Sequence, residues 1–290
     1  MDPNRRIRQP GPAAPERVQF AEGRGAALAF DLDPGLNLID AIHRPLARAG
    51  YTSAVLELEG GAFGPFTYVI PSLPQTPEHA AFYSDPVRPT GLSHLSSGAV
   101  TFGRGGAGPF LHCHAFWSEV DGMRHGGHVI PTETVVAKAI HARAWALDGI
   151  SFATASDPET NFTLFGPVPE AADSSRATTG RAFGLRLRPN HDICGALEAF
   201  CRDHRIPAAT IRGGVASIIG AVFEDGTVVR DFATEMFIRA GQIGLDGSGE
   251  PRAQLDVALV TYTGACAEGR LRRGANPVLM TAELALEVAG

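Results

Sequence analysis

Three histidines with short spacing are the residues of this chain best suited to chemistry. His112 and His114 flank Cys113, and His128 follows a pair of glycines a little further along the chain. In a β-strand, residues i and i+2 point to the same side, so an H-x-H pair aims two ring nitrogens at one point. A third histidine from a neighbouring strand completes a three-histidine site, and three protein ligands with one open position are typical of catalytic zinc. We therefore predict that His112, His114 and His128 bind zinc or another divalent transition metal.

The turn between the two expected strands decides whether the third histidine joins the first two. A two-residue Asp-Gly turn would make His128 face away from the pair, because a shift of one residue moves every side chain to the other face. A three-residue loop that ends at a left-handed Gly122 pairs Glu119 with Met123 instead and places His128 opposite His114. We predict this second register, since only it makes the site.

A metal that acts on a substrate also needs a group that handles protons. The sequence offers four candidates for this proton-transfer role, Glu57, Glu59, Glu119 and His94. Arg88 or Arg124 could pair with a substrate carboxylate. His125 lies three residues before His128, so in a regular strand it faces the other side.

Composition limits the classes of partner. The formal net charge is −6 and the isoelectric point is about 5.9, whereas a DNA-binding surface usually shows as a basic patch or domain. The four cysteines form no C-x-x-C pair, which predicts reduced thiols and a cytoplasmic location. No apolar run approaches 18 residues, so we expect no membrane partner. The expected partner is a small-molecule substrate.

The chain is expected to contain two divergent copies of one unit. Each copy opens with a strand and a turn, continues with an amphipathic helix and a strand near paired glycines, and ends in strands. The predicted divisions are a flexible leader at 1–16, a metal-binding domain at 17–150, a linker at 151–177 and a degenerate copy without the histidines at 178–290. A long polar segment at 73–97 predicts a functional lid or disorder.

The H-x-H and G-G-H motifs, together with the strand, turn, helix and glycine-containing strand, resemble the PPC ("plants and prokaryotes conserved") domain. The resemblance covers most of residues 17–150 and, more weakly, 178–290. It implies an α+β fold, in which each PPC-like unit is a curved mixed β-sheet with a few flanking helices, and it implies a homo-oligomer. The histidine signature also resembles that of alpha-acetolactate decarboxylase, a zinc enzyme, in which His112, His114 and His128 match the metal ligands.

Three functions follow as hypotheses. The first is a zinc-dependent lyase or hydrolase that acts on a small oxygenated carboxylic acid, ester or lactone. The second is a DNA-binding or regulatory PPC protein, which the acidic composition and the lack of an AT-hook disfavour. The third is a metal-stabilised assembly module that has no catalytic activity.

Overall fold

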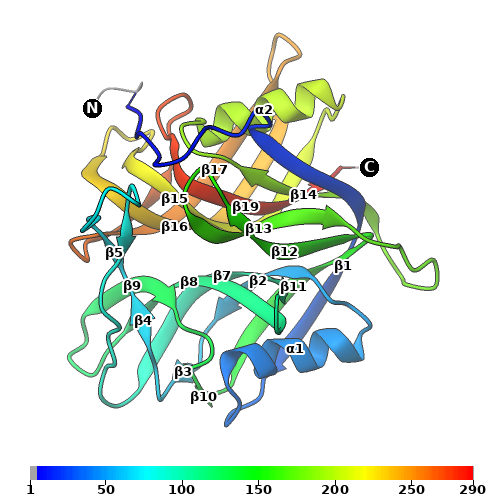
Figure 1. The fold of residues 1–290 in the computed structure, drawn as a ribbon. Helices are drawn as coiled ribbons and strands as arrows, with labels where there is room; N and C mark the ends of the chain where they lie inside the picture. Colours follow the sequence, from blue (N-terminus) through cyan, green and yellow to red (C-terminus); the bar gives the residue numbers. More distant parts are fainter. Residues whose placement is uncertain (1–4, 290) are drawn as a thin grey trace.

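Strands form most of the computed structural model, which describes residues 5–289, and the described residues contain two helices (Figure 1). The N-terminal half consists of β1 (Val18–Leu32), α1 (Leu38–Arg48), β2 (Ala54–Glu59), β3 (Ala62–Phe63), β4 (Tyr68–Val69), β5 (Pro71–Ser72), β6 (Phe82–Tyr83), β7 (Ser93–Gly105), β8 (Gly108–Ser118), β9 (Arg124–Val129), β10 (Val136–Lys138) and β11 (Ile140–Asp148). Two strands follow it, β12 (Ile150–Asp157) and β13 (Phe162–Pro169). The C-terminal half consists of β14 (Gly180–Leu187), α2 (Ile193–Asp203), β15 (Ala209–Val222), β16 (Val228–Leu245), β17 (Pro251–Thr261), β18 (Cys266–Arg270) and β19 (Val278–Val288).

The two halves repeat one order of strand pairing. In the N-terminal half, β1 pairs with β11, β11 with β2, β2 with β7, β7 with β8, and β8 with β9. In the C-terminal half, the corresponding pairs are β14–β19, β19–β15, β15–β16, β16–β17 and β17–β18. Each half carries one helix of 11 residues directly after its first strand.

Strand β1 joins the halves, because it pairs with β11 and also with β14, and the result is one 17-stranded sheet. Among the described strands, the pairings are antiparallel except for a single parallel contact between β7 and β12. The fold is therefore mostly β. The predicted fold class is met in part: each half has one flanking helix where a few were expected, and the sheet has a single parallel pairing where a mixed sheet was expected. The long segments after each helix form strands, because their apolar patterns have strand length.

Each helix packs one apolar face on its own half. Asn37 caps α1 by accepting a hydrogen bond from the Asp40 backbone nitrogen, and Asp192 caps α2 in the same way through Gly195. Helix α1 continues through Pro45 to Arg48, although proline removes one backbone donor. Buried side chains such as Leu38 and Ile42 hold it on the sheet, and this burial outweighs the lost hydrogen bond.

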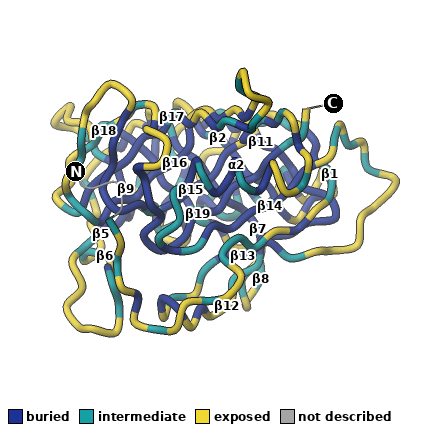
Figure 2. The backbone as a smooth tube through the Cα atoms, turned by 90° about the horizontal axis from the view of Figure 1, so that it is seen from above, coloured by how far each residue is buried: buried dark blue, intermediate teal, exposed yellow. Residues whose placement is uncertain are grey.

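The two halves lie as stacked layers, with α1 on the outside of one and α2 on the outside of the other (Figure 1). Ala99 and Phe116 of the N-terminal half form an apolar cluster with Val215, Phe237 and further residues of the C-terminal half. Viewed from above, the central strands are buried, and exposed residues lie mainly in the connecting loops (Figure 2). The histidine-bearing strand β8 therefore faces the other half of the same chain.

Two expectations about chain segments differ from the structure, and a third is met in part. The expected linker at 151–177 contains most of β12 and all of β13, which pair along their full length. The expected flexible leader packs on the C-terminal half in its described part, where buried Gln9 donates to the Leu279 carbonyl. The polar segment at 73–97 includes β6 and the start of β7. No helix among the described residues has the length and apolar character needed to span a membrane.

Candidate metal centre

The hairpin of β8 and β9 has the register that the sequence predicts. The Glu119 backbone nitrogen donates to the Met123 carbonyl, and Gly122 adopts a left-handed φ of 75°. The loop therefore has three residues, and His114 lies directly opposite His128. Cross-strand partners share a face, so both rings point towards the C-terminal half.

The three histidine rings lie together. Their centroids are separated by 4.6 Å for His112 and His114, 4.9 Å for His112 and His128, and 5.4 Å for His114 and His128. One candidate ligand atom from each ring can be chosen so that all three lie within 4.8 Å of one another. This cluster of the described residues could hold a metal ion.

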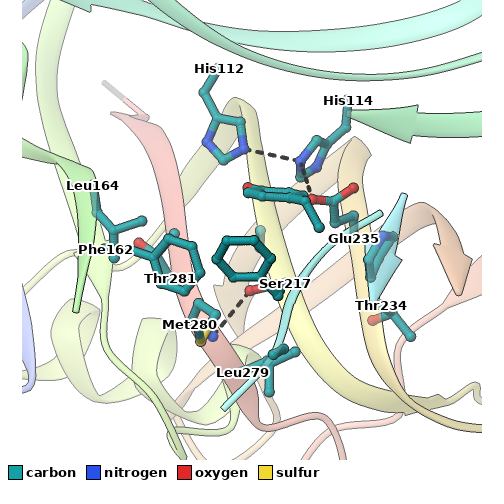
Figure 3. Close-up of a pocket in the computed structure, with 15 residues that line it drawn as sticks. His112, His114, Phe162, Leu164, Ser217, Thr234, Glu235, Leu279, Met280 and Thr281 are labelled. Atoms are coloured by element: carbon teal, nitrogen blue, oxygen red, sulfur yellow. Dashed lines mark hydrogen bonds and ion pairs between the residues drawn. The ribbon is translucent and has the colours of Figure 1, made fainter. Parts of the chain in front are cut away.

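Hydrogen bonds on the far side of two rings fix which nitrogens face the cluster. His114 Nδ1 lies 2.9 Å from the Met236 carbonyl oxygen, and His112 Nδ1 lies 3.0 Å from Glu283 Oε2 (Figure 3 shows His112 and His114). A carbonyl and a carboxylate oxygen accept hydrogen bonds, so we assign the proton of each neutral ring to Nδ1. Each Nε2 then keeps a bare lone pair.

The two bare nitrogens face each other at close range. His112 Nε2 and His114 Nε2 are 3.0 Å apart, and two lone pairs at that distance repel unless a positive charge lies between or beside them. Nitrogens bound to one zinc at about 2.0–2.1 Å in tetrahedral geometry lie about 3.3 Å apart. The donor set thus fits a cation. A metal-binding imidazole commonly donates its other N–H to a carboxylate or a backbone carbonyl, as both rings do here.

The electrostatic state of the rings also suits ligation. Burial, with a further contribution from the neighbouring His112, holds the pKa of His114 well below its usual value, and it does the same for His128. Both rings are therefore neutral near pH 7, which is the form that binds metals. His128 Nδ1 is buried and has no hydrogen-bond partner, which leaves it available to a ligand.

Glu235 of β16 completes the cluster from the C-terminal half. Its Oε1 lies 3.6 Å from His114 Nε2 and 3.8 Å from His128 Nδ1, and only 5% of the residue is exposed. Its Oε2 is buried without a hydrogen-bond partner. Burial raises the pKa of Glu235 well above its usual value, because the charged form loses its hydration. A bound cation would lower the pKa of Glu235 again, because its charge stabilises the carboxylate.

A small cavity of about 50 Å³ opens beside His112, His114 and Glu235 (Figure 3). Tyr83 of β6 lines it, and the Tyr83 ring centroid lies 5.1 Å from that of His128. Burial, and then the carboxyl groups of Glu235 and Glu283, raise the pKa of Tyr83 well above its usual value. The segment expected to be a lid thus places one aromatic side chain over the cluster.

The candidate proton-transfer residues predicted from the sequence lie elsewhere. Glu57 and Glu59 both form ion pairs with Arg143, and the side chains are partly exposed. Glu119 accepts a hydrogen bond from the Trp117 ring nitrogen, and His94 is exposed at the start of β7. In the described part of the chain, no hydrogen bond, ion pair or ring contact joins any of these four to the three histidines.

The remaining sequence candidates have partners on the surface. Arg88 forms an ion pair with Glu133 at 2.7 Å, and Arg124 forms one with Glu268 at 3.0 Å. His125 lies opposite Trp117, on the other side of the hairpin from the three-histidine cluster. Among the residues that the structure describes, no hydrogen bond, ion pair or ring contact joins either arginine to the three histidines, and both form ion pairs at the surface.

The hairpin of β17 and β18 shows what replaces the histidines in the C-terminal half. Its turn has the same hydrogen bonds as the first hairpin, from Thr261 to Ala265 and from Gly264 back to Thr261. Counting from the two turns, Asp256 and Arg270 occupy the positions of His114 and His128. They lie opposite each other and form an ion pair at 2.9 Å.

Sequence reasoning missed Glu235 and Glu283, the two acidic residues at the cluster. Both come from the half that lacks histidines, and β19 buries Glu283 with 1% of the residue exposed. A usable signal was present, because each is a glutamate within a largely apolar stretch of its strand, residues 232–238 in β16 and 278–286 in β19. A charged residue in such a strand is rarely buried without a partner, so it marks a candidate site.

Comparisons with known proteins place the family match in the C-terminal half. Residues 174–289 match the model of the Plants and Prokaryotes Conserved (PCC) domain, the domain that the sequence motifs resemble. No protein with curated annotation matches the chain. The match therefore covers the half that supplies Glu235 and Glu283, whereas the three histidines lie outside it.

Solved structures resemble part of the chain. A plant- and prokaryote-conserved protein of Pyrococcus horikoshii has a TM-score of 0.39 and 16% identity over 52% of this chain and 96% of its own. A metal-containing protein of Archaeoglobus fulgidus has a TM-score of 0.40 and 23% identity over 50% and 96%. A candidate DNA-binding protein of Ralstonia eutropha has a TM-score of 0.34 and 12% identity over 49% and 90%. Each resembles about half of this chain, and similarity at this level assigns no activity to it.

Proposed function

We propose that this chain is a zinc-binding protein built from two PPC-like units, and that it acts as a metalloenzyme on a small oxygenated carboxylic acid, ester or lactone. His112, His114 and His128 are the ligands in this proposal, and another divalent transition metal could take the place of zinc. The reaction is a hydrolysis or a lyase reaction. The resemblance of the histidine motif to alpha-acetolactate decarboxylase is compatible with a lyase reaction.

The observation that carries the proposal is the close approach of two ring nitrogens. His112 Nε2 and His114 Nε2 face each other at 3.0 Å, while the two Nδ1 atoms lie within hydrogen-bond distance of Glu283 and the Met236 carbonyl, to which we assign the ring protons as donors. Such an arrangement is unfavourable on its own and favourable around a cation. We infer that the strands are arranged to hold one.

Each residue of the cluster has a distinct role in the proposed reaction. A bound zinc would polarise a carbonyl oxygen or lower the pKa of a water molecule. We assign to Glu235 the role of taking and returning the substrate's proton, because its buried carboxyl lies 3.6 Å from His114 Nε2 and lines the cavity. Glu283 orients His112 through Nδ1. Tyr83 limits the access of water to the cluster.

The first experiment is elemental analysis of the purified protein beside the triple variant His112→Ala, His114→Ala, His128→Ala. We expect about one equivalent of metal in the native chain and none in the variant. A matched control replaces the exposed His94 and the half-buried His141, which pairs with Asp31, by alanine and should keep the metal. Equal metal content in the native chain and the triple variant would refute the proposal.

The second experiment asks whether the site is catalytic. Glu235→Gln keeps the shape of the side chain and removes its ability to accept a proton. We expect this variant to retain metal but to lose about 10²- to 10⁴-fold in turnover of small activated esters, the usual contribution of a general base. If the native chain shows no turnover across esters, lactones and hydroxy acids while chelation still lowers its melting temperature, the site is a metal-stabilised module without catalysis.

A further inference from the structure

The cavity beside the histidines has one polar end and otherwise apolar surroundings. His112, His114 and Glu235 form the polar end, and Leu279 and Met280 of β19 lie at the other end (Figure 3). Phe162 and Leu164 of β13 form a side wall, and the aromatic residues of β6 form another. The cavity therefore lies between the strands of both halves, with the candidate metal centre as its polar end.

Hydroxyl groups in the cavity wall already have hydrogen-bond partners. Ser217 Oγ accepts a hydrogen bond from the Met280 backbone nitrogen, and Thr234 Oγ1 donates to the Ile218 carbonyl. Thr281 Oγ1 accepts from the Arg186 side chain. Ser217 and Thr281 only accept in these bonds, so each keeps an O–H donor. The histidine end still holds most of the polar groups, and a polar group placed among Leu279, Met280 and Phe162 that does not reach these hydroxyls would lose hydration without compensation.

The size of the cavity sets a limit on what it accepts. Its volume is about 50 Å³. By this measure a cavity needs roughly 10–15 Å³ to hold one water molecule, so this space takes about three heavy atoms of that size. An aromatic ring would need roughly 150 Å³, the volume of an apolar cavity that takes up benzene.

We propose that this cavity is the specificity pocket of the enzyme and takes a short aliphatic group of two or three carbons from the substrate. The oxygen atoms of that substrate reach the three histidines, and its alkyl group contacts Met280 and Leu279. This inference rests on the proposed function. It limits the group that enters this cavity to a short alkyl chain; a second cavity of about 180 Å³, which His112, His128 and Glu283 help to line, opens on the same cluster for the rest of the substrate.

The test uses linear hydroxamates, which chelate zinc through two oxygens, with alkyl chains from acetohydroxamate to octanohydroxamate. Binding to the zinc-loaded full chain is measured by calorimetry. We expect affinity to rise about fourfold for each methylene group that enters the cavity. The rise should end after two or three carbons, and longer chains should bind more weakly.

Two variants test whether these wall residues set the limit. Met280→Ala enlarges the cavity and should move the optimum to a longer chain by one to three carbons. Met123→Ala is a matched control at an exposed site on the hairpin turn and should leave the series unchanged. Leu164→Ala is a second enlarging variant, for use if Met280→Ala does not fold.

The outcomes separate this inference from the proposed function. A chain that takes up no zinc refutes the proposed function and this inference together. A chain that takes up zinc but binds all hydroxamates equally, or binds octanohydroxamate best, refutes the pocket alone. An optimum that stays at the same chain length in both enlarging variants also refutes it.

Discussion

Glu283 is a carboxyl group in the middle of an apolar strand, and its burial has an energetic consequence. Removing a carboxylate from water is costly unless a hydrogen-bond partner compensates it. Here the partner is His112 Nδ1 at 3.0 Å, while Glu283 Oε1 has no partner. The buried carboxyl of Glu283 thus depends on His112 for its hydrogen bond, and the same hydrogen bond orients the ring of His112.

We predict that Glu283→Ala weakens metal binding by about 10- to 100-fold, the usual effect of losing a residue that orients a metal ligand. Glu283→Gln should recover part of the affinity, because its amide oxygen still accepts the hydrogen bond. The measurement is a competition titration with a metal chelator. Glu287→Ala is the control on the same strand, since Glu287 pairs with Arg212 instead. Equal effects of the two alanine variants would contradict this role.

The clustering of the histidines could be predicted from the sequence, whereas the sequence marks their acidic neighbours only as buried charges and does not say that they meet the histidines. His112, His114 and His128 lie within one hairpin, so local strand geometry and one turn decide where their rings point. Glu235 and Glu283 reach the same place only because two sheet faces pack together. Chain-local patterns contain no information on that packing, and they led instead to Glu57 and Glu59, which pair with Arg143.

The two hairpins of the chain share a turn and differ in what they carry. Gly122 and Gly264 have φ values of 75° and 82° and close equivalent three-residue loops. The first hairpin presents histidines to the other half, and the second presents the ion pair of Asp256 and Arg270. The three-residue turn therefore determines the strand register of both hairpins. The residues at equivalent positions of the two hairpins determine what each presents to the other half.

We predict that deletion of Gly122 abolishes metal binding while the chain still folds. A loop shortened by one residue forces a two-residue turn and moves His128 to the opposite face of the hairpin. The matched control deletes Gly264 in the second hairpin and should retain metal. Elemental analysis of both proteins, with circular dichroism as a check of folding, measures the result. Metal retained after loss of Gly122 would show that the register does not control the site.

The hairpin of β12 and β13 connects the two halves through buried ion pairs. Asp157 at the end of β12 is 3% exposed and forms ion pairs with Arg188 at 2.7 Å and Arg186 at 3.1 Å, both in or next to β14. Burial raises the pKa of Asp157, but the hydrogen bond from Arg188 and the charge of Arg186 outweigh it, so the pKa lies below the usual value. The expected linker is thus a structural element of the interface. Its prolines misled the prediction, because proline is also tolerated in edge strands.

We predict that Asp157→Asn destabilises the protein by about 3 to 5 kcal/mol at pH 7, the usual effect of breaking a buried ion pair. The folded-state pKa lies below the unfolded value of about 3.9, so the contribution is complete above that pH and is lost as pH falls through the folded-state pKa. The difference between native and variant should therefore shrink in acid. Urea denaturation at pH 7 and near pH 3 measures it, with the exposed Asp33→Asn as control. A difference independent of pH would contradict the ion-pair explanation.

Fusion of two similar units in one chain allows their facing surfaces to differ. A ring of identical subunits must place the same residues on every copy of an interface, so any acid that suits one histidine would be repeated throughout the assembly. Here one unit carries the three imidazoles and the other carries Glu235 and Glu283, and each set can change by mutation without altering its counterpart. Two non-identical units thus free a shared cluster from symmetry, and the acidic residues of one half can change while the three histidines of the other stay intact.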